Sequence, residues 1–167
     1  MSVYDRIIVA EAKFLSQIIT LLRLGAGETW PGEIALTFSP HIASSLSLSF
    51  RKGIILFAGT NGKTTTSLMI TTILRATGAR VVHNATGANL LNGIVSSCIR
   101  ASDWTGKLEA DWGVFEVDEN SLPIALKYIK PKAIVILNLF RDQLDRYGEV
   151  DVIVEKWEKA IKKLSKS

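Results

Sequence analysis

The sequence has 167 residues, of which 47% are hydrophobic and 22% are charged, and its formal net charge is +4. This length matches one globular domain with a single core, and the composition excludes a disordered chain. The positive charge is spread out and forms no run of basic and aromatic residues, so we expect no nucleic-acid partner. The single cysteine, Cys98, excludes an internal disulfide and a cysteine-built zinc site, which is typical of a cytoplasmic protein.

The first apolar segment, Ile7 to Leu24, is predicted to be an amphipathic helix that ends at the glycines of residues 25–27. Charged and amide side chains interrupt it too often for a membrane span or a cleaved signal peptide. Its apolar stripe is expected to pack on the protein's own core or on a partner, in preference to a membrane surface. Trp30-Pro31-Gly32 is interpreted as a turn into a short strand, Glu33–Phe38, and Pro40 as the opening of a short helix.

From residue 53 onward, apolar runs that resemble buried strands alternate with helical stretches. The predicted strands are Ile54–Ala58, Arg80–His83, Trp112–Val117 and Ala133–Asn138. The predicted helices are Thr64–Thr77, Leu90–Ala101, Leu122–Ile129 and a last one from about Asp151 to Leu164. This alternation predicts an α/β fold, a parallel sheet with helices on both faces. We therefore expect residues 1–52 to be a lead-in segment and residues 53–167 to be the main domain.

The segment between the first of these strands and its helix is predicted to bind a nucleoside triphosphate. It contains Gly59, Thr60, Asn61, Gly62, Lys63, Thr64 and Thr65. The strict phosphate-loop (P-loop) pattern places its first glycine at the position of Phe57, but Gly62-Lys63-Thr64 retains the functional half. Gly62 lets the backbone approach phosphates, and the helix N-terminus points N–H groups at them. Lys63 is expected to contact the terminal phosphates, and the Thr64 hydroxyl to bind Mg²⁺.

The variant Gly-Thr-Asn-Gly-Lys-Thr-Thr resembles the loop of the Mur ligase family, which includes the folylpolyglutamate synthases. The run of residues 136–149, from Ile136-Leu137-Asn138 through Asp142, Asp145, Arg146 and Tyr147 to Glu149, resembles the segment that follows a central strand in that family. Gln143 stands where most members carry a histidine associated with a second metal ion. The run with Gln143, the opening Trp30-Pro31-Gly32 and residues 82–90 resemble the corresponding segments of one branch of the family. Members of that branch amidate D-glutamate of lipid II.

The resemblance implies a central P-loop domain that uses ATP and Mg²⁺ to activate a carboxylate as an acyl phosphate, which an amine then attacks. In the branch named above, ammonia comes from a separate glutaminase subunit, and the substrate is a peptidoglycan precursor. Cys98 lies within a predicted helix without the glycine-flanked turn of a nucleophile, so it is expected to be a core residue and the nitrogen to come from a partner.

Carboxylates at the ends of the third and fourth strands complete the candidate site. Glu116 matches the acid that Mur ligases place opposite the loop as a Mg²⁺ ligand, and Asp118 and Glu119 are alternatives. Lys63, Glu116 and Asp142 are the catalytic candidates, whereas Asp145 and Arg146 either face the same cleft or pair with each other. The resemblance also implies a carbamylated lysine, for which Lys156 and Lys159 are both candidates. His41 and His83 lack metal-ligand spacing and are expected to be structural.

Members of this branch are longer and carry a zinc ribbon and a C-terminal domain. We therefore expect this chain to be the N-terminal part of a ligase that works with a separate C-terminal half, or a diverged module that binds nucleotide and a partner without catalysis. A relative of the folylpolyglutamate synthases and a small kinase or GTPase are further alternatives. The sequence lacks the Asn-Lys-x-Asp motif that reads guanine, which disfavours a GTPase.

Overall fold

A computed structural model describes residues 1–21, 29–84, 88–140 and 149–164. Four parallel strands form one sheet in the order β2-β3-β1-β4. Their bounds are β1 Phe50–Ala58, β2 Val81–His83, β3 Ala110–Val117 and β4 Ala133–Ile136. The helices are α1 Val3–Leu21, α2 Trp30–Phe38, α3 Ile42–Ser47, α4 Lys63–Ala76, α5 Leu91–Ala101, α6 Leu122–Tyr128 and α7 Glu149–Leu164.

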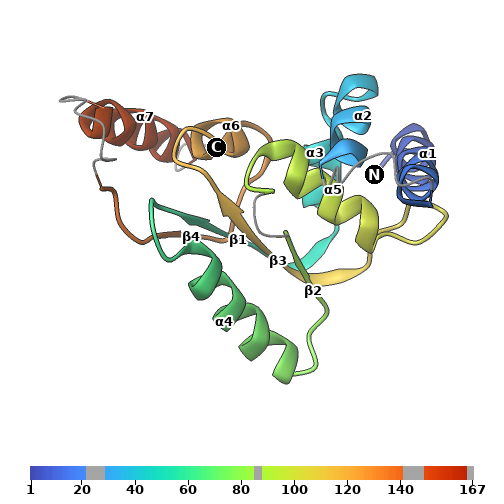
Figure 1. The fold of residues 1–167 in the computed structure, drawn as a ribbon, viewed down its shortest axis with the longest axis horizontal. Coiled ribbons are helices and arrows are strands. Elements are labelled where there is room, and N and C mark those ends of the chain that lie inside the picture. The colour runs from blue at the N-terminus through green and yellow to red at the C-terminus, as the bar shows by residue number, and fades with distance from the viewer. Residues whose placement is uncertain (22–28, 85–87, 141–148, 165–167) are drawn as a thin grey trace.

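The sheet lies between two unequal helical layers. In Figure 1, α4 lies alone below the sheet, and the other helices lie above it. Right-handed crossovers account for this arrangement, because the chain moves from β1 across β3 to β2 and then reverses direction through α5 and α6. The apolar runs of β1 and β3 are buried at the centre, with Leu56 and Phe115 fully buried. The predicted α/β fold with helices on both faces is therefore confirmed.

The predicted strand over Glu33–Phe38 is wrong, because these residues belong to helix α2. Pro31 lies in the first helical turn, where a missing N–H costs nothing, and it therefore starts the helix and does not mark a turn. Gly32 lets α2 pack closely on α5, since a Cβ there would lie 1.9 Å from the carbonyl oxygen of Asn92. The Gly32 N–H also donates to Ser96 Oγ at 2.8 Å. Packing between these helices therefore overrides the local strand pattern.

The remaining predicted elements are present, with shifted ends. The short helix predicted near Pro40 is α3, and β1 begins at Phe50, four residues before the predicted start. The predicted end of the first helix, at residues 25–27, lies outside the described residues. In the part of the chain that the structure describes, no helix has both the length and the apolar character needed to cross a membrane.

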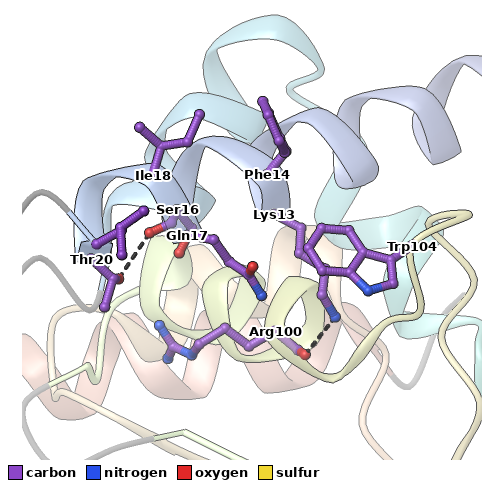
Figure 2. A pocket seen from close by; sticks show the side chains of 9 residues that line it. Lys13, Phe14, Ser16, Gln17, Ile18, Thr20, Arg100 and Trp104 are labelled. Carbon is purple, nitrogen blue, oxygen red and sulfur yellow. Dashed lines mark hydrogen bonds between the residues drawn. The ribbon is translucent and has the colours of Figure 1, made fainter.

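Helix α1 is tied to the end of α5 by one lysine. The Lys13 ammonium donates hydrogen bonds to the carbonyl oxygens of Arg100, at 3.0 Å, and Ser102. It also lies 5.4 Å from the centre of the Trp104 ring. Figure 2 shows Lys13 with the Arg100 carbonyl and the Trp104 ring at the hollow that α1 forms with Arg100 of α5 and with Trp104. A cation at the C-terminus of a helix is favoured by the helix dipole, so Lys13 stabilises the contact between the two helices.

We expect the substitution Lys13→Met to lower the free energy of unfolding by about 1–2 kcal/mol, because it keeps the apolar stem but removes a charged donor and its interaction with the helix end. Urea denaturation followed by circular dichroism would measure the change. Lys52→Met, at an exposed position of β1, is the matched control and should change stability little. Equal midpoints for the wild type and Lys13→Met would show that this contact contributes nothing.

Candidate nucleotide-binding site

The predicted phosphate loop follows β1 at the carboxyl edge of the sheet and leads directly into α4. Gly62 is the N-cap of α4 and has a φ of 82°, and Gly59 has a φ of 146°. Both values lie in the region that side chains with a Cβ rarely adopt, so both positions favour glycine. The loop therefore presents backbone, with little side-chain bulk, at the N-terminus of a 14-residue helix. The N–H groups of a first helical turn lack intrahelical partners and are suited to bind an anion.

Asn138, which follows β4, holds the loop in place. Its side-chain oxygen accepts from the Asn61 N–H at 2.9 Å, and its side-chain nitrogen donates to the Asn61 carbonyl at 3.0 Å. The carbonyl of Asn138 accepts from the Thr60 N–H at 2.9 Å. A Cβ on Gly59 would lie 2.8 Å from that same carbonyl, so the close approach requires glycine. Sequence reasoning used Asn138 only as part of a motif and missed its role in shaping the loop.

The Lys63 side chain folds back over the loop. Its ammonium donates to the carbonyl oxygens of Gly59 and, at 3.2 Å, Thr60, and it lies 4.0 Å from a carboxylate oxygen of Asp118. Burial raises the pKa of Asp118, and the nearby Lys63 charge offsets part of that rise. The Lys63 charge therefore lies over the loop, close to its N–H groups, and its contact with phosphates stays a prediction.

Thr64 and Glu116 lie side by side, although 52 positions separate them in the sequence. Thr64 Oγ1 donates to Glu116 Oε2 at 2.8 Å, and Ser67 Oγ donates to Glu116 Oε1 at 2.9 Å. Glu116 lies at the end of β3 and is only 4% exposed. Its buried carboxylate is held by these two hydroxyl donors. A hydroxyl and a carboxylate oxygen at this spacing are suited to share one Mg²⁺ ion.

Two further residues hold Glu116 in place: Asn84, to which sequence reasoning assigned no role, and His83, which was expected to be structural. The buried Asn84 side chain accepts from the Glu116 N–H at 2.8 Å and donates to the Glu116 carbonyl at 2.9 Å. His83 Nε2 lies 2.9 Å from Ser67 Oγ and 3.6 Å from Glu116 Oε1. Both residues lie at the end of β2, beside the strand that carries Glu116. This position in the sequence could have predicted their contact with Glu116.

Burial lowers the pKa of His83 below its usual value; Glu116 opposes this shift, and Arg75 adds to it. The neutral imidazole is therefore the favoured form beside Glu116 at neutral pH. Because the folded-state pKa lies below the unfolded value, the unfolded chain binds more protons in mildly acidic solution. His83 consequently stabilises the fold less as the pH falls below its unfolded pKa of about 6.5.

Some of the other predicted residues lie outside the described ranges, and the rest are placed by the structure. Asp142, Gln143, Asp145 and Arg146 lie outside the described residues. Glu119 uses its carbonyl to accept from Trp157 Nε1 at 2.7 Å, and Lys156 and Lys159 are exposed on α7. Cys98 is buried in α5, and burial raises the pKa of its thiol to about 12, which agrees with a core role. Thr65 follows Lys63 and Thr64 in the first turn of α4.

The residues present fit a triphosphate with Mg²⁺. Gly59 and Gly62 leave room at the helix N-terminus that a Cβ would reduce, and Thr64 and Glu116 offer two hard oxygen ligands. Within the described ranges, no group of three or more histidine, cysteine, aspartate or glutamate side chains is placed to hold a metal ion. A metal bound here would take its remaining ligands from phosphate oxygens and water, which is the usual coordination of Mg²⁺ at nucleotide sites.

Comparisons with known proteins identify the family of this chain. The profile of the Mur ligase middle domain matches residues 57–167, which is more than half of the sequence. The chain belongs to the Mur ligase family, whose members are ATP-dependent amide ligases, and the resemblance stated from its motifs is confirmed. It is the ATP-binding middle domain of that family and is related to MurT.

Two relatives are subunits named MurT of lipid II isoglutaminyl synthase (glutamine-hydrolyzing). The protein from Streptococcus pneumoniae (strain ATCC BAA-255 / R6) is 43% identical over 136 residues, covering 81% of this chain and 29% of the relative. The protein from Staphylococcus aureus (strain COL) is 41% identical over 128 residues, covering 77% of this chain and 28% of the relative. The chain thus spans less than a third of the length of these relatives.

A solved structure shows the same fold. A crystal structure of MurF from Acinetobacter baumannii superposes with a TM-score of 0.57 at 22% identity, covering 77% of this chain and 27% of that one. The profile match lies inside the main domain expected from the sequence, 53–167; the division near residue 53 stays a prediction.

Proposed function

We propose that this chain is the ATP-binding part of an amide ligase that activates a carboxylate as an acyl phosphate. The observation that carries the proposal is the 2.8 Å contact between Thr64 Oγ1 and Glu116 Oε2 at the first turn of α4. A hydroxyl and a carboxylate oxygen this close together are suited to bind one Mg²⁺ ion, which supports the proposal. The membership of the Mur ligase family supports the type of reaction.

The residues have separate roles in this proposal. The backbone from Gly59 to Thr65 and the N-terminus of α4 bind the phosphates, and Lys63 neutralises their charge. Thr64 and Glu116 would hold Mg²⁺, which would supply Lewis-acid stabilisation of the negative charge on the phosphates. Asn138 holds the loop, and Ser67 and Asn84 hold Glu116. Asp142 remains a catalytic candidate by its motif.

We propose D-glutamate of the peptidoglycan precursor lipid II as the substrate and ammonia as the amine. The name of the MurT relatives, lipid II isoglutaminyl synthase (glutamine-hydrolyzing), supports this choice. Cys98, buried with a raised pKa, is unsuited to be the nucleophile of a glutaminase. The ammonia is therefore proposed to come from a separate glutaminase subunit of the GatD type.

We expect the 167 residues alone to bind ATP–Mg²⁺ and to form no amide, even with excess ammonium. An acyl phosphate must be shielded from water while the amine is brought in line, which a second domain closing over the nucleotide achieves. The described residues supply the phosphate loop and the Thr64–Glu116 pair, which would form one side of such a cleft. Adding a C-terminal Mur ligase half and a glutaminase should restore amidation.

The experiment measures phosphate release and amidated D-glutamyl stem peptide, with the chain alone and in each mixture. A Lys63→Ala chain in the complete mixture is the control for the site. Amidation by the chain alone would contradict the need for a second domain. A complete mixture that associates, binds ATP and stays inactive would favour a nucleotide-binding module without catalysis. Activity with folate and glutamate in place of the stem peptide would instead indicate a folylpolyglutamate synthase relative.

A further inference from the structure

A basic groove lies between α6 and α7, apart from the nucleotide site (the two helices are side by side in Figure 1). Its volume is about 450 Å³. The apolar part of its lining comes from Pro123 and Leu126 of α6 and from Ala160 and Leu164 of α7. Five lysines complete the lining: Lys127, Lys130, Lys156, Lys159 and Lys163.

The helices that form the groove are firmly attached to the domain. Ile153 and Trp157 of α7 are buried, and Trp157 Nε1 donates to the carbonyl of Glu119 at 2.7 Å. Leu126 of α6 is 7% exposed and belongs to the core. The groove is thus bounded by packed helices, and a ligand would meet a surface that is already formed.

The charged side chains among the described residues that line the groove are of one sign, because none of these lining residues is acidic. Lys156, Lys159 and Lys163 follow a spacing of three and four residues and so share one face of α7. Lys127 lies in the last turn of α6, and Lys130 follows the end of that helix. Of the acids on α7, Glu155 pairs with Lys159 at 3.4 Å and Glu158 pairs with Lys162, which does not line the groove. The net charge facing the groove is therefore positive.

We propose that this groove binds an acidic amphipathic helix of a partner protein. A groove between two packed helices accepts a third helix, whose apolar residues at spacings of three and four would cover the apolar lining. Glutamates on either side of that apolar stripe would meet the lysines, which complements the charge of the groove. A bare phosphate group gains nothing from an apolar lining, and a flat bilayer does not follow a concave surface. The chemistry thus favours a peptide helix over a nucleic acid or a membrane.

The first test uses the wild-type chain and a synthetic peptide of about 18 residues, roughly five helical turns. The peptide carries leucines at spacings of three and four and glutamates elsewhere. Its controls are a scrambled peptide of the same composition and a peptide of glutamates alone. We expect saturable binding of the amphipathic peptide, with amide NMR shifts in α6 and α7, and at least about tenfold weaker binding of both controls.

The second test compares two matched double substitutions. Lys127→Glu with Lys130→Glu reverses two charges at the groove, and Lys52→Glu with Lys162→Glu reverses two exposed charges elsewhere. We expect the first pair to weaken peptide binding by about tenfold or more and the second by less than about twofold. All four side chains are exposed, so both variants should retain the wild-type circular dichroism spectrum.

Three results would overturn the proposal. Equal binding of the scrambled peptide would show that charge alone acts, without a helix in the groove. Equal losses in the two double variants would show that the groove is not the binding surface. Binding of single-stranded oligonucleotides or of anionic phosphatidylserine vesicles in the same assay, without binding of the peptide, would assign the lysines to another class of ligand. The wild-type peptide comparison decides the question even if a variant does not fold.

Discussion

Replacing Lys63 with alanine is expected to remove most of the affinity of this chain for ATP while leaving its fold intact. The Lys63 ammonium lies over the loop, where its contacts are two loop carbonyls and a distant carboxylate of Asp118. Losing a charged donor to phosphate costs about 1.5–3 kcal/mol, so the dissociation constant should rise about 10- to 100-fold. Equilibrium titration with ATP and Mg²⁺, beside a thermal unfolding curve, would measure both properties.

Lys52→Ala is the matched control for this prediction. Lys52 is exposed on β1, at a distance from the loop. Its substitution removes the same charge as Lys63→Ala, so the dissociation constant of this variant for ATP should change little. An unchanged dissociation constant in a folded Lys63→Ala protein would contradict the assignment of Lys63. An equal loss in both variants would mean that only the overall charge of the chain attracts ATP.

Thr64→Ala and Glu116→Gln are expected to weaken ATP binding strongly in Mg²⁺ and little in EDTA. Both side chains are proposed to reach the nucleotide through the metal, so removing the metal should remove the difference from the wild type. Loss of one metal ligand should raise the dissociation constant in Mg²⁺ about 10-fold or more. Titrations of the wild type and of each variant in the two solutions would give the six dissociation constants needed.

Asp118→Asn and Glu119→Gln serve as comparisons, because the sequence left both acids as alternative ligands. Asp118 accepts from the Asn89 side chain and lies near Lys63, and Glu119 contacts α7 through its backbone. For both variants, we expect the ratio of the dissociation constant for ATP in EDTA to that in Mg²⁺ to stay near the wild-type value. A Mg²⁺-specific loss in Asp118→Asn, without one in Glu116→Gln, would move the metal site to Asp118.

Patterns that depend on neighbouring residues in the sequence were sufficient to predict the sheet and the loop. The central strands β1 and β3 are apolar runs that are buried between helices, which is typical of a parallel sheet. The short pattern Gly62-Lys63-Thr64 identified the loop because its glycine and helix N-terminus act locally. Glu116 was placed near the loop because parallel strands end at a common edge.

Features that depend on contacts between distant segments were missed. Helix α2 was predicted to be a strand because its pattern gave no sign that Gly32 would pack on Asn92. Asn138 and Asn84 hold the loop and the end of β3 by bonds that span 77 and 32 positions, which no local pattern reveals. His83 was expected to be structural, and its place beside Ser67 and Glu116 follows only from the strand order.

The most direct test of the central proposal is a titration of the wild-type chain with ATP in Mg²⁺, followed by backbone amide NMR shifts. We predict saturable binding with the largest shifts at the amides of Gly62, Lys63 and Thr64, because these groups lie at the N-terminus of α4. Saturable binding that leaves these amides unshifted, or no saturable binding at all, would contradict the assignment of this loop as the nucleotide site.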